Sequence, residues 1–333
     1  MNQKINILVD GMGGDVGQGI VKSVLDLNMN FELFVSCIDK TSSWLYKVEK
    51  SYIFPLVNDD EFIDFLINFL LEHKINIYFP TIDSSLIKIA MYKDYIEEKT
   101  GTCVFIDDLE KIKICDDKYL TYKFLQDNNF SAPHTINLDN SDLDLFLDKY
   151  EYPFILKTKT GNGSNNIMEI SKYDELKPFI GNKNWIIQEK LNIKNEITAG
   201  VYIGNDQELK GLYVLKRTLK CGSTFHAERI IDSCLEKEII SIAKKLNMKY
   251  VNIQAVYEDG VLLPFEFNGR LSGTSGAMRS VFNIPEFYIK ETIHHEYITP
   301  CTNKEKFFFT RYREEIMYTE SNQEELLNRS TRK

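Results

Sequence analysis

The pattern of apolar and polar positions predicts alternating strands and helices in the first third of the chain. Four apolar runs bounded by turn residues are typical of buried strands, at residues 5–11, 31–39, 75–81 and 102–107. Between them, apolar residues recur at helical spacing over 17–28, 59–74 and 84–101. This alternation predicts a parallel α/β sheet with helices on both of its faces.

The pattern changes beyond residue 115. A helix is expected to begin after the N-cap signal of Asp116 and Asp117 and to end before Pro133. Short strands then dominate, at 153–158, 166–170, 185–191, 196–203, 209–219, 250–260 and 261–268, with helices expected at 173–180 and 233–247. A last strand is expected within 307–316 with its aromatic side chains in the core, and the polar tail 320–333 is expected to fray.

Composition and charge exclude several classes of protein. The 333 residues are 43% hydrophobic, but no stretch approaches the ~20 uninterrupted apolar residues of a membrane span. A net charge of −9 argues against nucleic-acid binding through a general basic surface. The N-terminus lacks the pattern of a signal peptide, and the six cysteines contain no C-x-x-C pair, so we expect a cytoplasmic protein with reduced, mostly buried thiols.

A first glycine-rich stretch, residues 11–19, follows a strand and opens a helix, as dinucleotide-binding turns do. Asp39 even follows the second strand, where an acid that binds ribose would lie. However, Val16 stands where the G-x-G-x-x-G motif needs its last glycine. We therefore favour a tight turn that leaves helix N–H groups free for an anion, with an NAD site as the alternative.

A second glycine-rich stretch begins after Lys157, at the end of a predicted strand. Gly161 and Gly163 lie in a short loop of small polar residues that returns as a strand rather than a helix. This is not a P-loop, because no G-K-[ST] follows. Such a loop can fold its amides over phosphates, although an ordinary flexible hairpin has the same pattern.

The most informative stretch is the predicted hairpin of residues 250–268. Glu266 and Asn268 share one face of its second strand, and Arg270 follows on the same side. A two-residue turn would place Gln254 on the opposite face, whereas a three-residue turn with Gly260 at positive φ would bring Gln254 onto the face of Glu266. We favour the second register, because its carboxylate and amide oxygens are ligands that suit Mg²⁺.

Together these motifs resemble the ATP-grasp superfamily, and most nearly the large-subunit domains of carbamoyl phosphate synthase, in which a Gln precedes a Glu-x-Asn-x-Arg strand. The resemblance implies an N-terminal Rossmann-like parallel-sheet domain over 1–114. An ATP-grasp fold of two α+β subdomains would follow, over 115–190 with the glycine loop and over 191–333 with the metal and phosphate site. The chain departs from the family in having Gly269 where Pro often follows the metal-binding Asn, and lysines where arginine is commoner.

The same resemblance implies roles for individual residues. Gln254, Glu266 and Asn268 would bind magnesium, with Glu266 bridging two ions and Mn²⁺ as an alternative metal. Arg270 and Arg217 would act on the transferring phosphoryl group. ATP would be bound by Lys118, Lys157, Gly161, Gly163, Ser164, the adenine hinge of Glu189, Lys190 and Leu191, and the ribose-binding Glu196.

The implied activity is that of an ATP-dependent carboxylate–amine ligase, which activates a small-molecule carboxylate as an acyl phosphate for attack by an amine. A small-molecule kinase on the same scaffold and a non-catalytic nucleotide-binding regulator are the alternatives, and a nicotinamide oxidoreductase comes last. We expect the partners to be the small-molecule substrates. We expect binding neither to nucleic acid nor to a membrane, and a homodimer is possible.

Overall fold

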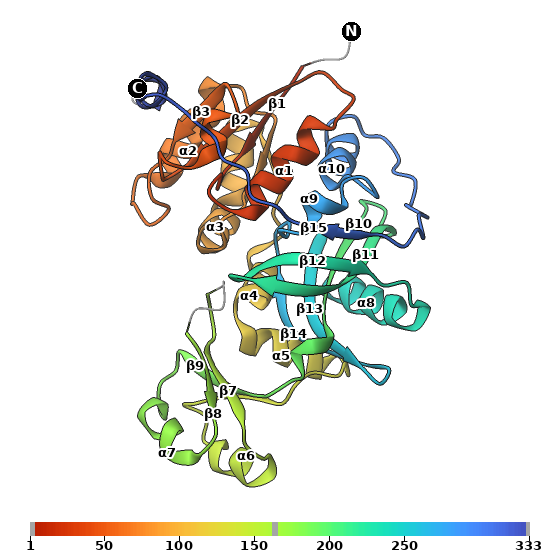
Figure 1. The fold of residues 1–333 in the computed structure, drawn as a ribbon. Helices are drawn as coiled ribbons and strands as arrows, with labels where there is room; N and C mark the ends of the chain where they lie inside the picture. Colours follow the sequence, from red (N-terminus) through yellow and green to blue (C-terminus); the bar gives the residue numbers. More distant parts are fainter. Residues whose placement is uncertain (1–3, 162–165, 331–333) are drawn as a thin grey trace.

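The computed structural model describes residues 4–161 and 166–330. Its first part is a five-stranded parallel sheet with the strand order β3-β2-β1-β4-β5 (Figure 1). The strands are β1 Ile5–Val9, β2 Phe31–Cys37, β3 Lys50–Ile53, β4 Ile77–Phe79 and β5 Cys103–Val104. The predicted parallel sheet is confirmed. The pattern missed β3, because four residues are too few to show a periodicity.

Helices cover both faces of this sheet, as predicted. They are α1 Asp15–Leu25, α2 Phe62–Glu72 and α3 Asp83–Thr100, with a short 3₁₀ turn, η1, at Ser43–Tyr46. Leu8 and Tyr78 belong to the core under α2 and α3, whereas Ile7, Val9 and Val35 belong to the core under α1. Because side chains alternate along each strand, continuous apolar runs fill both layers.

The next part of the chain forms a small antiparallel sheet, which lies at the bottom of the view in Figure 1. It is preceded by α4 Leu109–Asp116 and α5 Lys118–Asp127. Its order is β6-β9-β7-β8, with β6 Thr135–Asn137, β7 Phe154–Thr158, β8 Ile167–Ile170 and β9 Trp185–Glu189. One face is covered by α6 Leu143–Lys149, α7 Tyr173–Leu176 and the 3₁₀ turn η2 Lys177–Phe179.

A six-stranded antiparallel sheet of order β14-β13-β10-β11-β12-β15 lies between the other two. Its strands are β10 Glu196–Ile203, β11 Leu209–Lys220, β12 Ser223–Arg229, β13 Tyr250–Glu258, β14 Val261–Asn268 and β15 Phe308–Thr310, and the turn η3 Ile193–Asn195 precedes it. Helix α8, Ser233–Leu246, packs Leu235 and Ile239 onto the face that carries Ala199 and Ile253. The residues that alternate with these point to the opposite face, where the candidate site lies.

After β14 the chain returns to the first sheet through α9 Ser275–Met278 and α10 Ile284–Thr292. Helices α1 and α9 touch at a pair of glycines, because a Cβ placed on Gly276 would lie 2.4 Å from Cα of Gly19. A Cβ on Gly17 would likewise lie 2.6 Å from the carbonyl oxygen of Asp10. Two of the five glycines between residues 11 and 19 therefore serve close packing.

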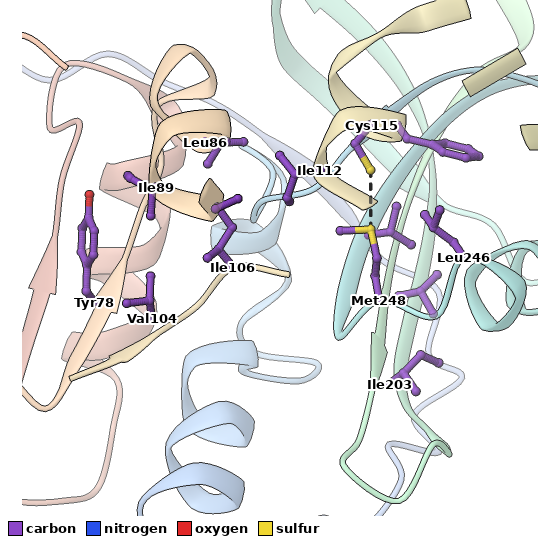
Figure 2. Close-up of a cluster of buried hydrophobic side chains, with 14 of the residues drawn as sticks. Tyr78, Leu86, Ile89, Val104, Ile106, Ile112, Cys115, Ile203, Leu246 and Met248 are labelled. Atoms are coloured by element: carbon purple, nitrogen blue, oxygen red, sulfur yellow. Dashed lines mark hydrogen bonds between the residues drawn. The ribbon is translucent and has the colours of Figure 1, made fainter. Parts of the chain in front are cut away.

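One hydrophobic core runs from the N-terminal sheet into the six-stranded sheet. Figure 2 shows Leu86 and Ile89 of α3 next to Ile112 of α4, followed by Cys115 and Met248, whose sulfur atoms are 3.5 Å apart. Because α4 spans the predicted boundary at residue 114 and packs into both parts, the division of the chain at 114 and 190 stays a prediction.

Three expectations about the surface need correction. The tail is not frayed up to residue 330, because α11, Glu320–Ser330, buries Leu326, and the N–H of Ile53 donates to Ser330 Oγ at 2.7 Å. In β15, Phe308 is 59% exposed rather than in the core. The cysteines are not mostly buried, since two of the six are buried and two are exposed.

In the described ranges, no helix is both long and apolar enough to cross a membrane.

Candidate active site

The β13–β14 hairpin brings Gln254 and Glu266 directly opposite one another. Its turn is a two-residue one, in which Asp259 and Gly260 both have positive φ. The three-residue turn that we favoured from the sequence is therefore wrong. The register shifts between Gln254 and Ala255 instead, because Phe265 is one extra residue in β14. This β-bulge restores the shared face that a two-residue turn alone would have abolished.

Asn268 completes a row of oxygen-bearing side chains on this face. It pairs with Asn252, two residue pairs along the ladder from Gln254 and Glu266. Its Nδ2 donates to Asn252 Oδ1 at 3.4 Å and approaches Glu266 Oε1 at 3.5 Å, which leaves its own Oδ1 available. The part of the chain that the structure describes has no group of three or more His, Cys, Asp and Glu placed to hold a metal. Two amides and one carboxylate are nevertheless hard oxygen donors that suit Mg²⁺.

The bulge also separates two phenylalanines that a regular strand would place on the same face. Phe267 is 1% exposed and packs edge-to-face against Phe124 of α5, with ring centroids 6.1 Å apart. Phe265 is half-buried, and the ammonium of Lys157 lies 5.7 Å from its ring centroid. Phe267 therefore belongs to the core, whereas Phe265 lies beside Lys157 of the small sheet.

Arg217 of β11 joins two of the predicted ligand groups. Its Nε donates to Glu196 Oε1 at 2.9 Å, and its Nη2 donates to Glu196 and, at 2.8 Å, to Gln254 Oε1. Both side chains of this ion pair are only 10% exposed. The structure thus joins three predicted site residues in one hydrogen-bond network: the phosphoryl-binding Arg217, the ribose ligand Glu196 and the metal ligand Gln254.

Lys118 is held against the start of the glycine loop. It opens α5, whose N-cap Asp117 accepts hydrogen bonds from the N–H groups of Tyr119 and Leu120, as the sequence predicted. The ammonium of Lys118 donates to the carbonyl oxygen of Gly161 at 2.7 Å. Gly161 has φ of 101°, a conformation that favours glycine. Gly163 and Ser164 lie outside the described residues.

Lys157 lies buried in β7, on the side that faces Glu266. Its ammonium donates to Gln188 Oε1 at 2.7 Å. Burial lowers the pKa of Lys157 to about 8, although the carboxylate of Glu266 opposes the shift and Lys118 adds to it. Lys157 of the small sheet and Glu266 of the large sheet therefore interact electrostatically across the space between the two sheets.

The predicted adenine hinge lies at the end of β9. The N–H of Glu189 donates to the carbonyl oxygen of His134 at 2.8 Å, and its carboxylate accepts the N–H of His134 at 3.3 Å. Lys190 pairs with Glu169 at 2.7 Å, and Leu191 is half-buried. The amide of Glu189 is thus already used within the protein, and a contact with adenine would fall to the backbone of the two residues after it.

Arg270 connects the site to the N-terminal sheet. Its Nη2 donates to Asp83, the first residue of α3, and its Nη1 to the carbonyl oxygen of Leu271 at 3.0 Å. Its buried Nε has no hydrogen-bond partner among the described residues. Asp83 follows β4, and β4 neighbours β1 where the strand order reverses. This is the position at which parallel α/β sheets bind ligands.

A second ion pair at the same edge was missed by the sequence analysis. Arg311, which follows β15, pairs with Asp15 of α1 at 2.7 Å and donates to the carbonyl oxygen of Gly273. The sequence gives no local signal for this pair, because Arg311 is separated from Asp15 by almost the whole chain. The carboxyl edge of the N-terminal sheet therefore meets two arginines from the C-terminal part.

Comparisons with known proteins agree with this arrangement. Residues 115–274 match the family model of the ATP-grasp domain. A carbamoyl-phosphate synthase of Methanobrevibacter smithii is 27% identical over 141 residues, which cover 42% of this chain and 38% of that protein. A coenzyme gamma-F420-2:alpha-L-glutamate ligase of Methanococcus maripaludis is 35% identical over 97 residues, which cover 27% of this chain and 34% of that protein. The chain thus spans only about a third of the length of these curated relatives.

The fold has a close counterpart among solved structures. The N5-carboxyaminoimidazole synthetase of Staphylococcus aureus, solved in complex with ADP, superposes with a TM-score of 0.73 over 93% of this chain and 83% of that chain, at 15% identity. The parallel sheet, the small sheet and the large antiparallel sheet thus occur together in a known protein. Residues 115–274 thus match an ATP-grasp domain, which follows an N-terminal parallel sheet.

Proposed function

We propose that this protein is an ATP-dependent ligase that joins a small-molecule carboxylate to an amine. One observation supports this most: Gln254, Glu266 and Asn268 line one face of the large sheet, and the buried ammonium of Lys157 interacts with Glu266 from the small sheet. A row of oxygen donors facing a cation is suited to binding a metal–triphosphate complex. The carbamoyl-phosphate synthase and the glutamate ligase among the relatives support the assignment.

The nucleotide would bind between the small and large sheets. Lys118 and Lys157 would hold the phosphates under the glycine loop, and the backbone at 190–191 would contact adenine. Glu196 would bind the ribose hydroxyls once its ion pair with Arg217 opens. Since ATP is a cytoplasmic metabolite, we place the reaction in the cytoplasm, and a homodimer remains a prediction.

The residues present fit magnesium. All three proposed ligands offer oxygen, and the Oδ1 of Asn268 and the Glu266 carboxylate form no strong hydrogen bond within the described residues. When bound, the metal would neutralise charge on the phosphate oxygens, with Mn²⁺ as the alternative ion. The Oε1 of Gln254 accepts a hydrogen bond from Arg217, and its second lone pair would bind the metal.

A free carboxylate does not react directly with an amine, because its oxide is a poor leaving group. The carboxylate would therefore first be phosphorylated. A carboxylate oxygen would attack the γ-phosphorus, the bond from that phosphorus to the β–γ bridging oxygen would break, and ADP would leave. The amine would then attack the acyl carbon, lose a proton and release phosphate. Arg270 and Lys157 would hold the charge of the transferring group.

Turnover with defined substrate pools tests the proposal. The protein is mixed with ATP, Mg²⁺ and pools of carboxylates with and without amines, and ADP and phosphate are measured. We expect phosphate release that requires both a carboxylate and an amine. A stable phosphorylated product would identify a kinase instead, and binding of ATP without turnover in any pool would identify a regulator.

Nucleotide affinity should fall as the pH rises through 8. The pKa of Lys157 is lowered to about 8, so its ammonium is mostly charged at pH 7 and mostly neutral at pH 9. If the charged form binds phosphate, the dissociation constant for ADP measured by calorimetry should rise about tenfold over that interval. Lys157→Arg keeps its charge and should remove this dependence. An equal pH dependence in both proteins would contradict the assignment of Lys157.

A further inference from the structure

A cavity of about 360 Å³ lies at the junction of the N-terminal sheet and the ATP-grasp domain. Residues 104–107, at the end of β5 and just after it, form one wall with Lys93 of α3. The opposite wall contains Lys249, the end of α10 and the backbone of Gly269. The exposed side chains of Asn205 and His295 lie at its rim. Val104 and Ile106, seen in Figure 2, belong both to this cavity and to the neighbouring hydrophobic core.

The two carboxylates that line the cavity are already paired. Glu291 is 6% exposed and accepts hydrogen bonds from Tyr202 Oη at 2.7 Å, from the N–H of Asn205 at 2.9 Å and from Lys249 Nζ at 3.2 Å. Asp107 accepts the N–H of Lys249 at 2.9 Å and lies 3.6 Å from the ammonium of Lys111. Both carboxylates therefore have cationic partners within the protein, and neither needs a bound cation as ligand.

The half-buried ammonium of Lys93 is different. It forms neither a hydrogen bond nor an ion pair with any residue that the structure describes, although it interacts electrostatically with the carboxylate of Asp107. That carboxylate already lies beside the ammonium of Lys111. A partly buried cation without a hydrogen bond is costly, and a second carboxylate can supply the charge-assisted hydrogen bonds that Lys93 lacks. The ligand of the cavity should therefore be an anion.

The size and walls of the cavity restrict that anion. At about 360 Å³ it lies near the lower end of the ~300–1,000 Å³ range of ligand sites, too small for a nucleotide. Phe105, Ile106 and Tyr288 give it an apolar side that would contact a short carbon chain. A small organic carboxylate satisfies both the charge and the shape.

The cavity and the proposed active site share a piece of backbone. Gly269 lines the cavity, while its neighbours Asn268 and Arg270 are the proposed metal and phosphate residues. A Cβ on Gly269 would lie 2.7 Å from Cδ1 of Ile112, so this backbone is tightly packed. A ligand that presses on Gly269 thus acts on the segment that positions both site residues.

We propose that this cavity is an effector site, in which a small organic carboxylate binds Lys93 and alters the active site through Gly269. The binding is independent of the proposed function, whereas the effect on turnover rests on it.

Binding is tested by calorimetry on the intact protein without nucleotide, with succinate, 2-oxoglutarate, aspartate and glutamate as probes and succinamide as the uncharged control. We expect at least one carboxylate, but not succinamide, to bind saturably. Lys93→Met should weaken that binding about tenfold or more, the loss of one charge-assisted hydrogen bond. Thr292→Phe, which places a large ring in the cavity, should abolish it.

Two further variants separate this cavity from other sites. Lys99→Met on the same helix replaces an exposed lysine near Tyr95, and it should bind as the wild type does. Arg270→Ala should also keep the binding, because Arg270 pairs with Asp83 and does not line the cavity. Loss of binding in Arg270→Ala with retention in Lys93→Met would place the carboxylate in the substrate site and overturn the proposal. So would the failure of all four probes to bind.

The effect on the active site is measured as ATP turnover at subsaturating ATP. The bound carboxylate should change the rate of the wild type at least twofold and leave Lys93→Met unchanged. Binding without any change in rate would contradict the link through Gly269. If the protein turns over no ATP with any pool, the proposed function is wrong. The calorimetric measurement then still tests binding of the carboxylate in the cavity.

Discussion

Glu266→Ala should lower ATP turnover by ~10² or more while the fold stays intact. Glu266 is half-buried on the site face and lies on no core layer, so its removal leaves no apolar cavity. Loss of the carboxylate would leave phosphate charge uncompensated when the phosphoryl group transfers. Glu266→Gln should be nearly as inactive, because the side chain keeps its shape but loses its charge. The measurement is phosphate release at saturating ATP and Mg²⁺.

A second readout separates a site role from a structural one. Because the carboxylate of Glu266 raises the pKa of Lys157, its removal should move the pH dependence of ADP binding to lower pH. Glu238→Ala is the matched control, since it removes a half-buried acid from α8 on the other face of the same sheet. The control should keep full turnover. Near-normal phosphate release by Glu266→Ala would remove the basis of the metal assignment and most of the ligase proposal.

The N-terminal sheet could be predicted because the apolar pattern of each strand directly reflects its burial in the sheet. Strands β1, β2 and β4 are buried on both faces, so each is a continuous apolar run bounded by turn residues. The pattern fails where packing decides instead. Helix α11 looks polar, yet Leu326 alone is 2% exposed and anchors it to β3. A single buried residue in a charged segment has no periodic signal.

The hairpin shows how a correct grouping can follow from an incorrect geometry. The sequence grouped Gln254 with Glu266 through a three-residue turn, but the chain uses the two-residue turn that Asp259 and Gly260 favour. The bulge at Phe265 corrects the register. A bulge depends on how a strand packs and bends, so the alternation of residues along one strand does not reveal it.

The charge partners of the site residues could not be predicted, because they come from distant parts of the chain. Arg270 pairs with Asp83, 187 residues away, and Arg217 pairs with Glu196 on the neighbouring strand. The family motif assigns these groups to phosphate, metal and ribose, and it says nothing of their partners within the protein. Arg217 donates to both Glu196 and Gln254, so the proposed ribose and metal ligands share one guanidinium partner.

Phe267→Ala should destabilise the protein by about 3 kcal/mol or more, through the cavity that it leaves. The ring is 1% exposed, belongs to the core that joins both sheets and packs edge-to-face against Phe124. Because that core runs from the N-terminal sheet to α8, the loss should appear as a lower midpoint of urea unfolding for the whole chain. Any loss of turnover should follow from unfolding and be recovered under stabilising conditions.

Phe265→Ala, two residues away on the same strand, is the matched control. Its ring is half-buried and lies near the ammonium of Lys157 rather than in the core, so its removal should cost only about 1 kcal/mol of stability. It should instead weaken nucleotide binding, because Lys157 loses the ring beside its ammonium. A bulge at residue 265 predicts this division between the two rings, whereas a regular strand predicts that both variants destabilise the core alike. Equal shifts in the unfolding midpoint would therefore contradict the bulged register, and with it the alignment of Gln254 and Glu266 on one face.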